Sequence, residues 1–516
     1  MTADHENHPV IRTPYGAVGG RWERSVAVFR GIPYAAPPFG PRRFRPPVPP
    51  DRWDGVRDAA AFGPTAPKPP YSETFAQYLS DPAVPGDDCL NLNVWTPDPA
   101  PGARLPVLIW LHGGALTRGS SAVPVYDGHT FARDGVVFVS LNYRLGVEGY
   151  GLFPDAPANP GLRDQLAALR WVHESIEAFG GDPDRITLGG QSAGAISTGA
   201  LIAAPQARGL VRRAVLQSGP PEVTDRDKVR RVVRRMAHRL KVPATAEAFA
   251  AVDRGQLLRV QADIGRLSSP ILGGPAFGVV VDGDLVPRDP LEALTDGAAR
   301  GVDLLTGWTR DEYRLWLVPG GLMERVDRLG AVALAGAMAR CRCGSEVPRG
   351  YRALHPDAGT AELVGQMVTD HLLRVPLHRL ADGRQDPSYV YEFAWPSRRP
   401  GMGACHALEL GFVFDSGDKP DARKLAGERA PQDLADAMHG AWVRFVTDGS
   451  PGWERWNEKH PVRMFGDGPP HTTHAPRDRE LALWTAPAPE HPAPAPTPEL
   501  RSVVRRLRRT GALRRT

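Results

Sequence analysis

Cysteine is scarce in this chain, with only four in 516 residues. So few thiols exclude a disulfide framework. Cys341 and Cys343 form a lone C-x-C pair, and no two further ligands lie close by at a spacing typical of a zinc site. We therefore expect unpaired thiols here, and neither a metal nor an organic cofactor.

Long apolar runs are also missing. No stretch reaches the roughly 18 apolar residues that indicate a transmembrane helix. The amino-terminal residues, M-T-A-D-H-E-N-H, lack the basic and then apolar pattern of a signal peptide. These absences predict a chain without a membrane span, and a cytoplasmic location is the default expectation.

The excess of basic residues is confined to the carboxyl-terminal end of the chain. The net charge is +5, but residues 501–516 alone carry seven arginines and no acidic residue, so without them it is −2. The main body is not basic, and we expect no nucleic-acid partner. We expect one domain over residues 1–484, a Pro- and Ala-rich linker over 485–500, and a basic, disordered tail over 501–516.

Apolar segments alternate between strand-like and helix-like patterns. Residues 162–179 place apolar side chains at spacings of three and four, which predicts a helix, and another helix is expected from residue 195. This alternation predicts an α/β fold with a large, mostly parallel sheet covered by helices on both faces. Short apolar runs predict its strands at residues 107–111, 136–141, 186–188 and 213–217.

Residues 190–194 have the sequence G-Q-S-A-G, which is a G-x-S-x-G motif. In such a motif the serine lies on a sharp turn between a strand and a helix, and glycines flank it because larger side chains would collide with the backbone. A predicted strand precedes the motif and a predicted helix follows it. Ser192 is therefore the predicted nucleophile, and a turn of small residues without catalytic role is the alternative.

A serine nucleophile needs further groups around it. It needs a general base, and that base needs an orienting carboxylate, in the chain order serine, acid, histidine. Fifteen histidines compete for the role. His406 lies late in the chain among small residues, as in a loop over the sheet, but spacing alone does not single it out.

A second small-residue segment precedes the G-x-S-x-G motif. Residues 112–115, H-G-G-A, follow the strand predicted at 107–111. Their backbone N–H groups are candidates to face a developing oxyanion, together with the N–H of Ala193, which follows the nucleophile. A tight glycine turn without this role is the alternative.

Longer motifs extend from about residue 13 to about residue 484. They are F-R-G-I-P-Y-A at 29–35, D-C-L-N-L-N-V at 88–94, N-P-G-L-R-D-Q at 159–165, F-G-G-D-P at 179–183 and Q-S-G at 217–219. With the serine motif they resemble the type-B carboxylesterase family, which includes bacterial para-nitrobenzyl esterases and animal cholinesterases. The resemblance implies the α/β-hydrolase fold and the hydrolysis of carboxylic esters.

The resemblance also implies roles for particular residues. It makes Ser192 the nucleophile, Glu312 the acid and His406 the base. The residues alone leave the acid open, because Asp311 is adjacent to Glu312. The resemblance implies that the oxyanion donors are the N–H groups of Gly114, Ala115 and Ala193, and that Arg43 pairs with Asp87 and Arg144 with Asp164.

Three positions depart from the family pattern. Gln191 stands where the family usually has glutamate, so the hydrogen bonding around the triad is expected to differ. Ala115 stands at the third glycine of the oxyanion loop, and its N–H remains available. Cys89 has no upstream cysteine, so the loop-closing disulfide of secreted relatives cannot form.

The predicted protein is a monomeric serine carboxylesterase that hydrolyses small-molecule esters through an acyl-enzyme. Carbamate or amide hydrolysis by the same residues is an alternative. A non-catalytic adhesion protein is a remote one, since all three triad positions are filled. Residues 64–89, where cholinesterases carry a choline-binding tryptophan, contain Tyr71, Phe75 and Tyr78 but no Trp, so neutral esters are expected to be preferred over choline esters.

Overall fold

A computed structural model describes residues 8–265 and 274–485. The predicted tail over 501–516 and the predicted linker from residue 486 onward lie outside the described residues.

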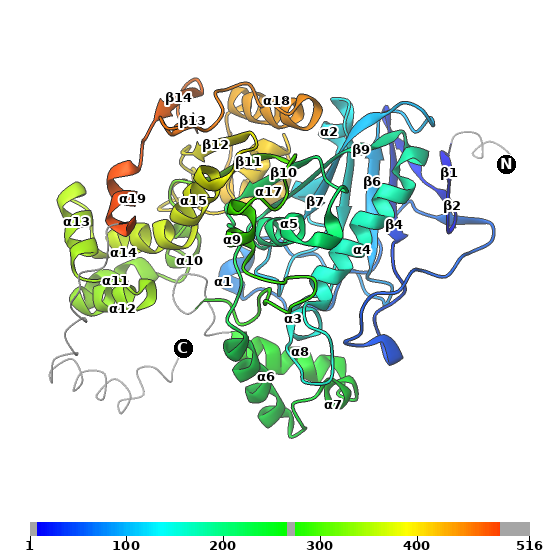
Figure 1. Cartoon of the computed structure of the whole chain (residues 1–516), viewed down its shortest axis with the longest axis horizontal. Coiled ribbons are helices and arrows are strands. Elements are labelled where there is room, and N and C mark those ends of the chain that lie inside the picture. Colours follow the sequence, from blue (N-terminus) through cyan, green and yellow to red (C-terminus); the bar gives the residue numbers. More distant parts are fainter. Residues whose placement is uncertain (1–7, 266–273, 486–516) are drawn as a thin grey trace.

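At the centre lies an 11-stranded sheet (Figure 1) with the order β14-β13-β12-β11-β10-β9-β7-β8-β6-β4-β3. In chain order its strands are β3 Arg21–Glu23, β4 Val26–Pro33, β6 Asn91–Thr96, β7 Leu105–Leu111, β8 Val137–Leu141, β9 Gly181–Gln191, β10 Arg213–Gln217, β11 Asp303–Thr309, β12 Ser388–Phe393, β13 Pro461–Phe465 and β14 His471–His474.

Neighbouring strands run parallel from β13 to β8 and antiparallel at both edges of the sheet. A separate small sheet joins β1 Val10–Thr13, β2 Gly16–Gly19 and β5 Val56–Asp58. The predicted α/β class and the α/β-hydrolase fold are confirmed. In the described part of the chain, no helix combines the length and the apolar character needed to cross a bilayer.

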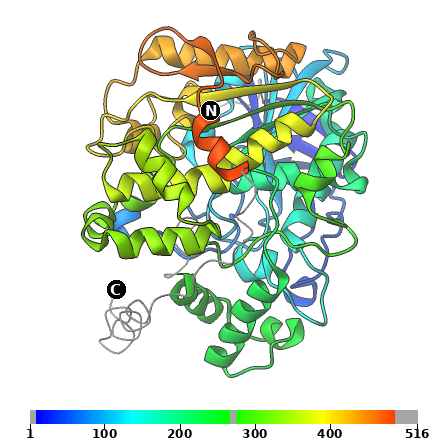
Figure 2. The ribbon, with the colours of Figure 1, turned by 60° about the vertical axis from the view of Figure 1, so that its left-hand side comes forward.

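Helices cover the sheet and extend beyond it. Figures 1 and 2 both place α6–α8 and α11–α14 as two groups away from the central strands. The helices are α1 Glu73–Ala76, α2 His129–Arg133, α3 Gly146–Tyr150, α4 Pro160–Ser175, α5 Ala193–Ala203, α6 Arg226–Leu240, α7 Ala246–Ala250, α8 Arg254–Gly265, α9 Pro290–Thr295, α10 Arg314–Leu317, α11 Leu322–Leu329, α12 Ala331–Cys341, α13 Glu346–Leu354, α14 Thr360–Thr369, α15 Val375–Gly383, α16 Leu410–Val413, α17 Pro420–Ala426, α18 Gln432–Asp448 and α19 Asp478–Thr485.

Strand β7 illustrates why the central strands are apolar throughout. Val107, Ile109 and Leu111 pack in the core cluster that includes α4 and α5, while Leu108 and Trp110 pack in the cluster that includes α2 and α18. Successive side chains of a strand point to opposite faces. A strand covered on both faces therefore carries an unbroken apolar run instead of an alternating one.

The predicted elements differ from the observed ones mainly in their ends. The helix expected over 162–179 is α4, Pro160–Ser175, continued by a 3-10 turn over Ile176–Phe179. The strand expected over 186–188 is longer, because β9 pairs with β7 on one side and β10 on the other. Pairing on both sides extends a strand beyond its most apolar residues.

One of the two implied ion pairs is confirmed and the other is wrong. Arg144 binds Asp164 in a buried pair, with 2.6 Å from Nη2 to Oδ1. Arg43 does not pair with Asp87, because its Nε lies 2.7 Å from Oε1 of Glu148. The Arg43 side chain is buried and needs a buried partner, whereas the Asp87 side chain is 65% exposed.

The parallel strands bring the predicted site residues to one edge of the sheet. The segment 112–115 follows β7, Ser192 follows β9, Glu312 follows β11, and His406 lies in the segment after β12. The carboxyl ends of parallel strands meet at one edge, which is where open α/β sheets bind their ligands.

Candidate active site

Ser192 lies on a strained turn between β9 and α5. Its φ and ψ are 57° and −121°, a conformation that residues with a side chain rarely adopt. The flanking glycines make the turn possible. A Cβ on Gly190 would lie 2.5 Å from the carbonyl carbon of Gly194, and a Cβ on Gly194 would lie 1.9 Å from the carbonyl oxygen of Leu111. The predicted sharp turn between strand and helix is present.

The backbone after β7 turns in a way that leaves N–H groups free. Gly114 and Ala115 have φ of 118° and 53°. Ala193 is the first residue of α5, where N–H groups have no partner within the helix. Over the described ranges, the backbone N–H groups of these three residues donate no hydrogen bond. They are therefore available to a negatively charged oxygen at the mouth of the site.

Glu312 and His406 form a short buried contact. The distance from His406 Nδ1 to Glu312 Oε2 is 2.5 Å. The other carboxylate oxygen, Oε1, accepts a hydrogen bond of 2.8 Å from the backbone N–H of Thr309. Burial raises the pKa of Glu312, but its interactions with His406, with the Ser218 hydroxyl and with the Thr309 N–H outweigh burial and hold that pKa below its ordinary value. The carboxylate is thus ionised and able to orient the imidazole.

Asp311 faces away from this pair. Its Oδ2 accepts a hydrogen bond of 3.0 Å from the backbone N–H of Ala404, and its own N–H donates to the carbonyl of Ala404. The two contacts fasten the segment that carries His406. Of the two adjacent carboxylates, only Glu312 is hydrogen bonded to the imidazole in the described residues.

Two further side chains surround His406. Nε2 of the imidazole lies 3.1 Å from the amide nitrogen of Gln191, the residue just before the serine. The ring of Trp316 packs against the imidazole with a centroid distance of 4.7 Å. Gln191 was identified as a departure from the family pattern, whereas nothing in the sequence near Trp316 pointed to the site.

A cavity of about 360 Å³ opens beside these groups. It brings together the predicted Ser192, Ala115, Ala193, Glu312 and His406, while Gly114 lies one residue from its wall. The remaining wall is mixed in polarity, and further lining residues that sequence reasoning missed are Glu222, Lys228, Phe277, Trp316, Arg340 and Leu372.

Glu222 is the unusual acid of this wall. Burial raises its pKa to about 7, and the nearby charges of Arg340 and Lys228 oppose that shift. The carboxyl therefore changes its charge near neutral pH. Nothing in the local sequence singles it out, because Arg340, the charge with the larger effect, comes from α12, far along the chain.

The chain is similar to known carboxylesterases along most of its length. A profile of the carboxylesterase family matches residues 7–465. The chain is 34% identical over 462 residues to a para-nitrobenzyl esterase of Bacillus subtilis, an alignment that covers 87% of this chain and 92% of that relative. It is 37% identical over 466 residues to a phenmedipham hydrolase of Pseudarthrobacter oxydans, covering 86% of this chain and 90% of the relative.

The solved structures agree with the sequence matches. A carboxylesterase of Geobacillus stearothermophilus superposes with a TM-score of 0.82 at 36% identity, over 92% of this chain and 99% of that one. The fold and these relatives define a serine carboxylesterase of the α/β-hydrolase fold. The chain belongs to the carboxylesterase family, as the motifs predicted.

Proposed function

We propose that Ser192, His406 and Glu312 are a catalytic triad that hydrolyses carboxylic esters through an acyl-enzyme. The observation that carries the proposal is the buried contact of 2.5 Å between Glu312 and His406, beside the cavity that Ser192 lines. A carboxylate on Nδ1 fixes the tautomer in which Nε2 carries the lone pair, and that lone pair is what a general base requires.

Acylation starts with attack of the Ser192 hydroxyl oxygen on the ester carbonyl. His406 accepts the hydroxyl proton on Nε2, and Glu312 stabilises the resulting imidazolium. In the resting site the Gln191 amide nitrogen lies 3.1 Å from the same Nε2, so this contact must give way when Nε2 accepts the Ser192 proton. His406 then gives the proton to the leaving alcohol, which departs and leaves the acyl group on Ser192.

The carbonyl oxygen becomes negative in each tetrahedral intermediate. The free N–H groups of Gly114, Ala115 and Ala193 are the proposed donors to it, and one such donor typically contributes about 2.7–4 kcal/mol. A water molecule then repeats the attack with His406 as its base, releases the carboxylic acid and restores the serine.

A fluorophosphonate probe tests this assignment directly. We expect the intact protein to be labelled on the peptide that contains Ser192, and Ser192→Ala to lose the label. Ser218 lines the same cavity, so Ser218→Ala is the matched control and should still be labelled. A label that persists in Ser192→Ala would place the nucleophile elsewhere, and no labelling at all would favour the non-catalytic alternative.

Carbamate hydrolysis is the second candidate. It is supported by the 37% identity to the phenmedipham hydrolase, because phenmedipham is a compound with carbamate groups. The same triad can attack a carbamate carbonyl, which is less electrophilic than that of an ester. Comparing kcat/KM for an ester and a carbamate with the same alcohol separates the two, and we expect the ester to be the better substrate. Monomeric state and cytoplasmic location stay predictions.

A further inference from the structure

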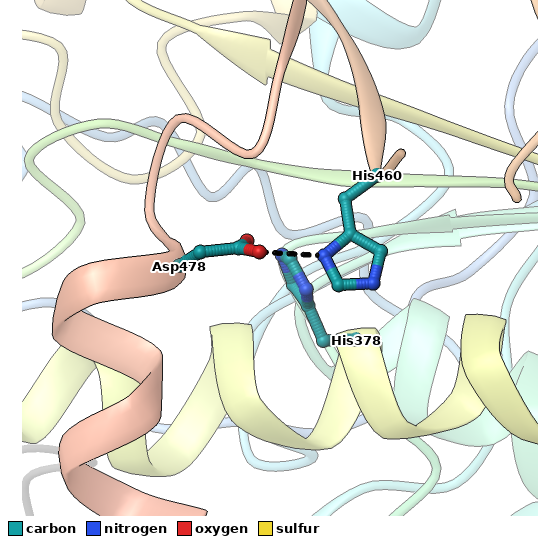
Figure 3. A group of neighbouring side chains, drawn as sticks. All are labelled: His378, His460 and Asp478. Carbon is teal, nitrogen blue, oxygen red and sulfur yellow. Dashed lines mark hydrogen bonds and ion pairs between the residues drawn. The ribbon is translucent and has the colours of Figure 1, made fainter. Parts of the chain in front are cut away.

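A second group of polar side chains lies away from the catalytic cavity. It consists of His378 in α15, His460 just before β13, and Asp478 at the start of α19. One nitrogen from each imidazole and one carboxylate oxygen all lie within 4.8 Å of one another. Figure 3 shows the three side chains converging from separate elements toward a common point.

Two atoms of this group are buried without a hydrogen-bond partner. They are Nε2 of His378 and Oδ1 of Asp478, as judged over residues 8–265 and 274–485. The His378 residue is only 7% exposed. Buried polar atoms are almost always paired, because an unpaired one loses its hydration without compensation. Together with the close spacing of the three residues, these unpartnered atoms support a further binding partner at this cluster.

The imidazole of His460 lies between two carboxylates. Its Nδ1 lies 2.8 Å from Oδ2 of Asp478, and its Nε2 lies 3.8 Å from Oδ1 of Asp382. Metal-bound histidines usually donate their other ring N–H to a carboxylate or carbonyl, which fixes the ring orientation. Asp382 is the carboxylate on that side, and the ring has to move closer to it, because 3.8 Å is beyond hydrogen-bond distance.

Trp456 holds both rings without using their nitrogens. It stacks on His460 with a centroid distance of 4.9 Å and an interplanar angle of 4°. It also meets His378 edge to face, at 4.9 Å and 90°. Its indole N–H donates to Asp382 over 2.8 Å. Trp456 therefore orients both rings without occupying a ring nitrogen, and Nε2 of His378 has no hydrogen-bond partner among the described residues.

We propose that His378, His460 and Asp478 bind one divalent transition-metal ion, with zinc as the first candidate. Two imidazoles and a carboxylate are common zinc ligands, and the fourth position is left to water. The ion would bind Nε2 of His378, Nδ1 of His460 and the carboxylate. The proton that Nδ1 of His460 now donates to Asp478 moves to Nε2 of the same ring, on the side of Asp382.

The bound ion would act on stability and not on the chemistry. None of the three ligands lines the cavity beside Ser192. They connect α15, the start of β13 and α19, so an ion there fastens the last described helix to the sheet. Binding to the folded chain alone stabilises it by mass action. The inference does not rest on the proposed triad.

The test uses the full chain stripped with EDTA and then dialysed against zinc. We expect about one zinc ion per chain by elemental analysis, and a higher melting temperature with zinc than without. The variants His460→Gln and Asp478→Asn should lose both effects. Their side chains are 29% and 41% exposed, so the substitutions leave the core intact. The histidine His474, on β14 at the surface, provides the matched control His474→Gln.

The zinc retained by the wild type and by the variants tests the proposal. Zinc retained by the wild type and by His474→Gln, but not by His460→Gln, supports the site. No retained zinc in the wild type, or equal retention in His460→Gln, overturns it. Turnover of a small ester at a temperature well below unfolding should be equal with and without zinc. A change in turnover without retained zinc would implicate the catalytic cavity and not this cluster.

Discussion

The serine side of the candidate site and its acid–base side are positioned by different kinds of contact. Ser192 is held by the backbone of the residues around it, since the turn from β9 to α5 admits only glycine at 190 and 194. Glu312 and His406 lie 94 residues apart in the chain and are joined by one hydrogen bond between side chains. The first arrangement is indicated by a local motif, although Gly194 is also required by its close approach to Leu111 of β7, and the second depends on segments that follow two other strands.

The two halves of the site therefore depend on different parts of the structure. Local backbone geometry persists as long as the strand and the helix form. The acid–base pair depends on two segments, after β11 and β12, that Asp311 fastens together through Ala404. Substitutions should therefore distinguish a loss of chemistry on the serine side from a loss of positioning on the acid–base side.

The largest expected effect on turnover comes from removing the nucleophile or the base, which belong to different halves of the site. Ser192→Ala and His406→Ala should each lower kcat by about 10⁶-fold, because triad members act as a unit. The double variant should be little worse than either single one. The measurement is turnover of a para-nitrophenyl ester, with circular dichroism to verify the fold. Losses that add in activation free energy would mean that the halves act separately.

The second prediction separates the two adjacent carboxylates. Glu312→Gln should lower kcat by roughly 10³–10⁴-fold, because an amide no longer stabilises the imidazolium. Asp311→Asn retains an oxygen that accepts from the Ala404 N–H, so it should lower kcat by less than about tenfold. Steady-state kinetics on one ester gives both values. If Asp311→Asn were the more damaging change, Asp311 would be the acid.

The third prediction concerns pH and a buried neighbour of the pair. Glu409 accepts from Gln217 on Oε1 at 3.2 Å, and its buried Oε2 has no partner among the described residues. Burial, reinforced by the charge of Glu312, raises its pKa from 4.5 to about 7, while His406 opposes the shift. A raised pKa favours the neutral form in the folded state, so this contribution to stability is lost as pH rises through about 7.

Glu409→Gln removes that titration. Between pH 5 and pH 8, the variant should gain stability relative to wild type by about 2 kcal/mol. Urea unfolding of both proteins at each pH provides the measurement. Glu428→Gln, at an exposed position, serves as the control and should show no such gain. Parallel pH profiles for Glu409→Gln and wild type would mean that the pKa of Glu409 is the same in the folded and the unfolded state.

The smallest expected effect concerns substrate charge. Tyr71 and Tyr78 each carry a guanidinium over the ring, from Arg118 at 5.2 Å and Arg399 at 5.1 Å. Their faces are therefore occupied, and neither ring lines the cavity beside Ser192. We expect kcat/KM for 3,3-dimethylbutyl butyrate to equal or exceed that for butyrylcholine. A preference of tenfold or more for the cation, about 1.4 kcal/mol, would require a cation site on another wall.

The sequence by itself determined the elements whose signals are local. Apolar runs buried on both faces gave β7 and β8 nearly to their ends, and the G-x-S-x-G motif gave the turn at Ser192, because glycine is required where the backbone approaches itself closely. The family resemblance pointed to Glu312 and His406. Residues alone left Asp311 equally possible, since both carboxylates occupy one short turn.

Only the tertiary structure decided which distant side chains meet. It turned Asp311 toward Ala404 and Glu312 toward His406. It paired Arg43 with Glu148 instead of Asp87. Contacts of this kind depend on how strands and helices pack across the sheet, and the local sequence does not specify that packing. For the same reason the sequence did not indicate the cluster of His378, His460 and Asp478. These residues become neighbours only when α15, β13 and α19 come together.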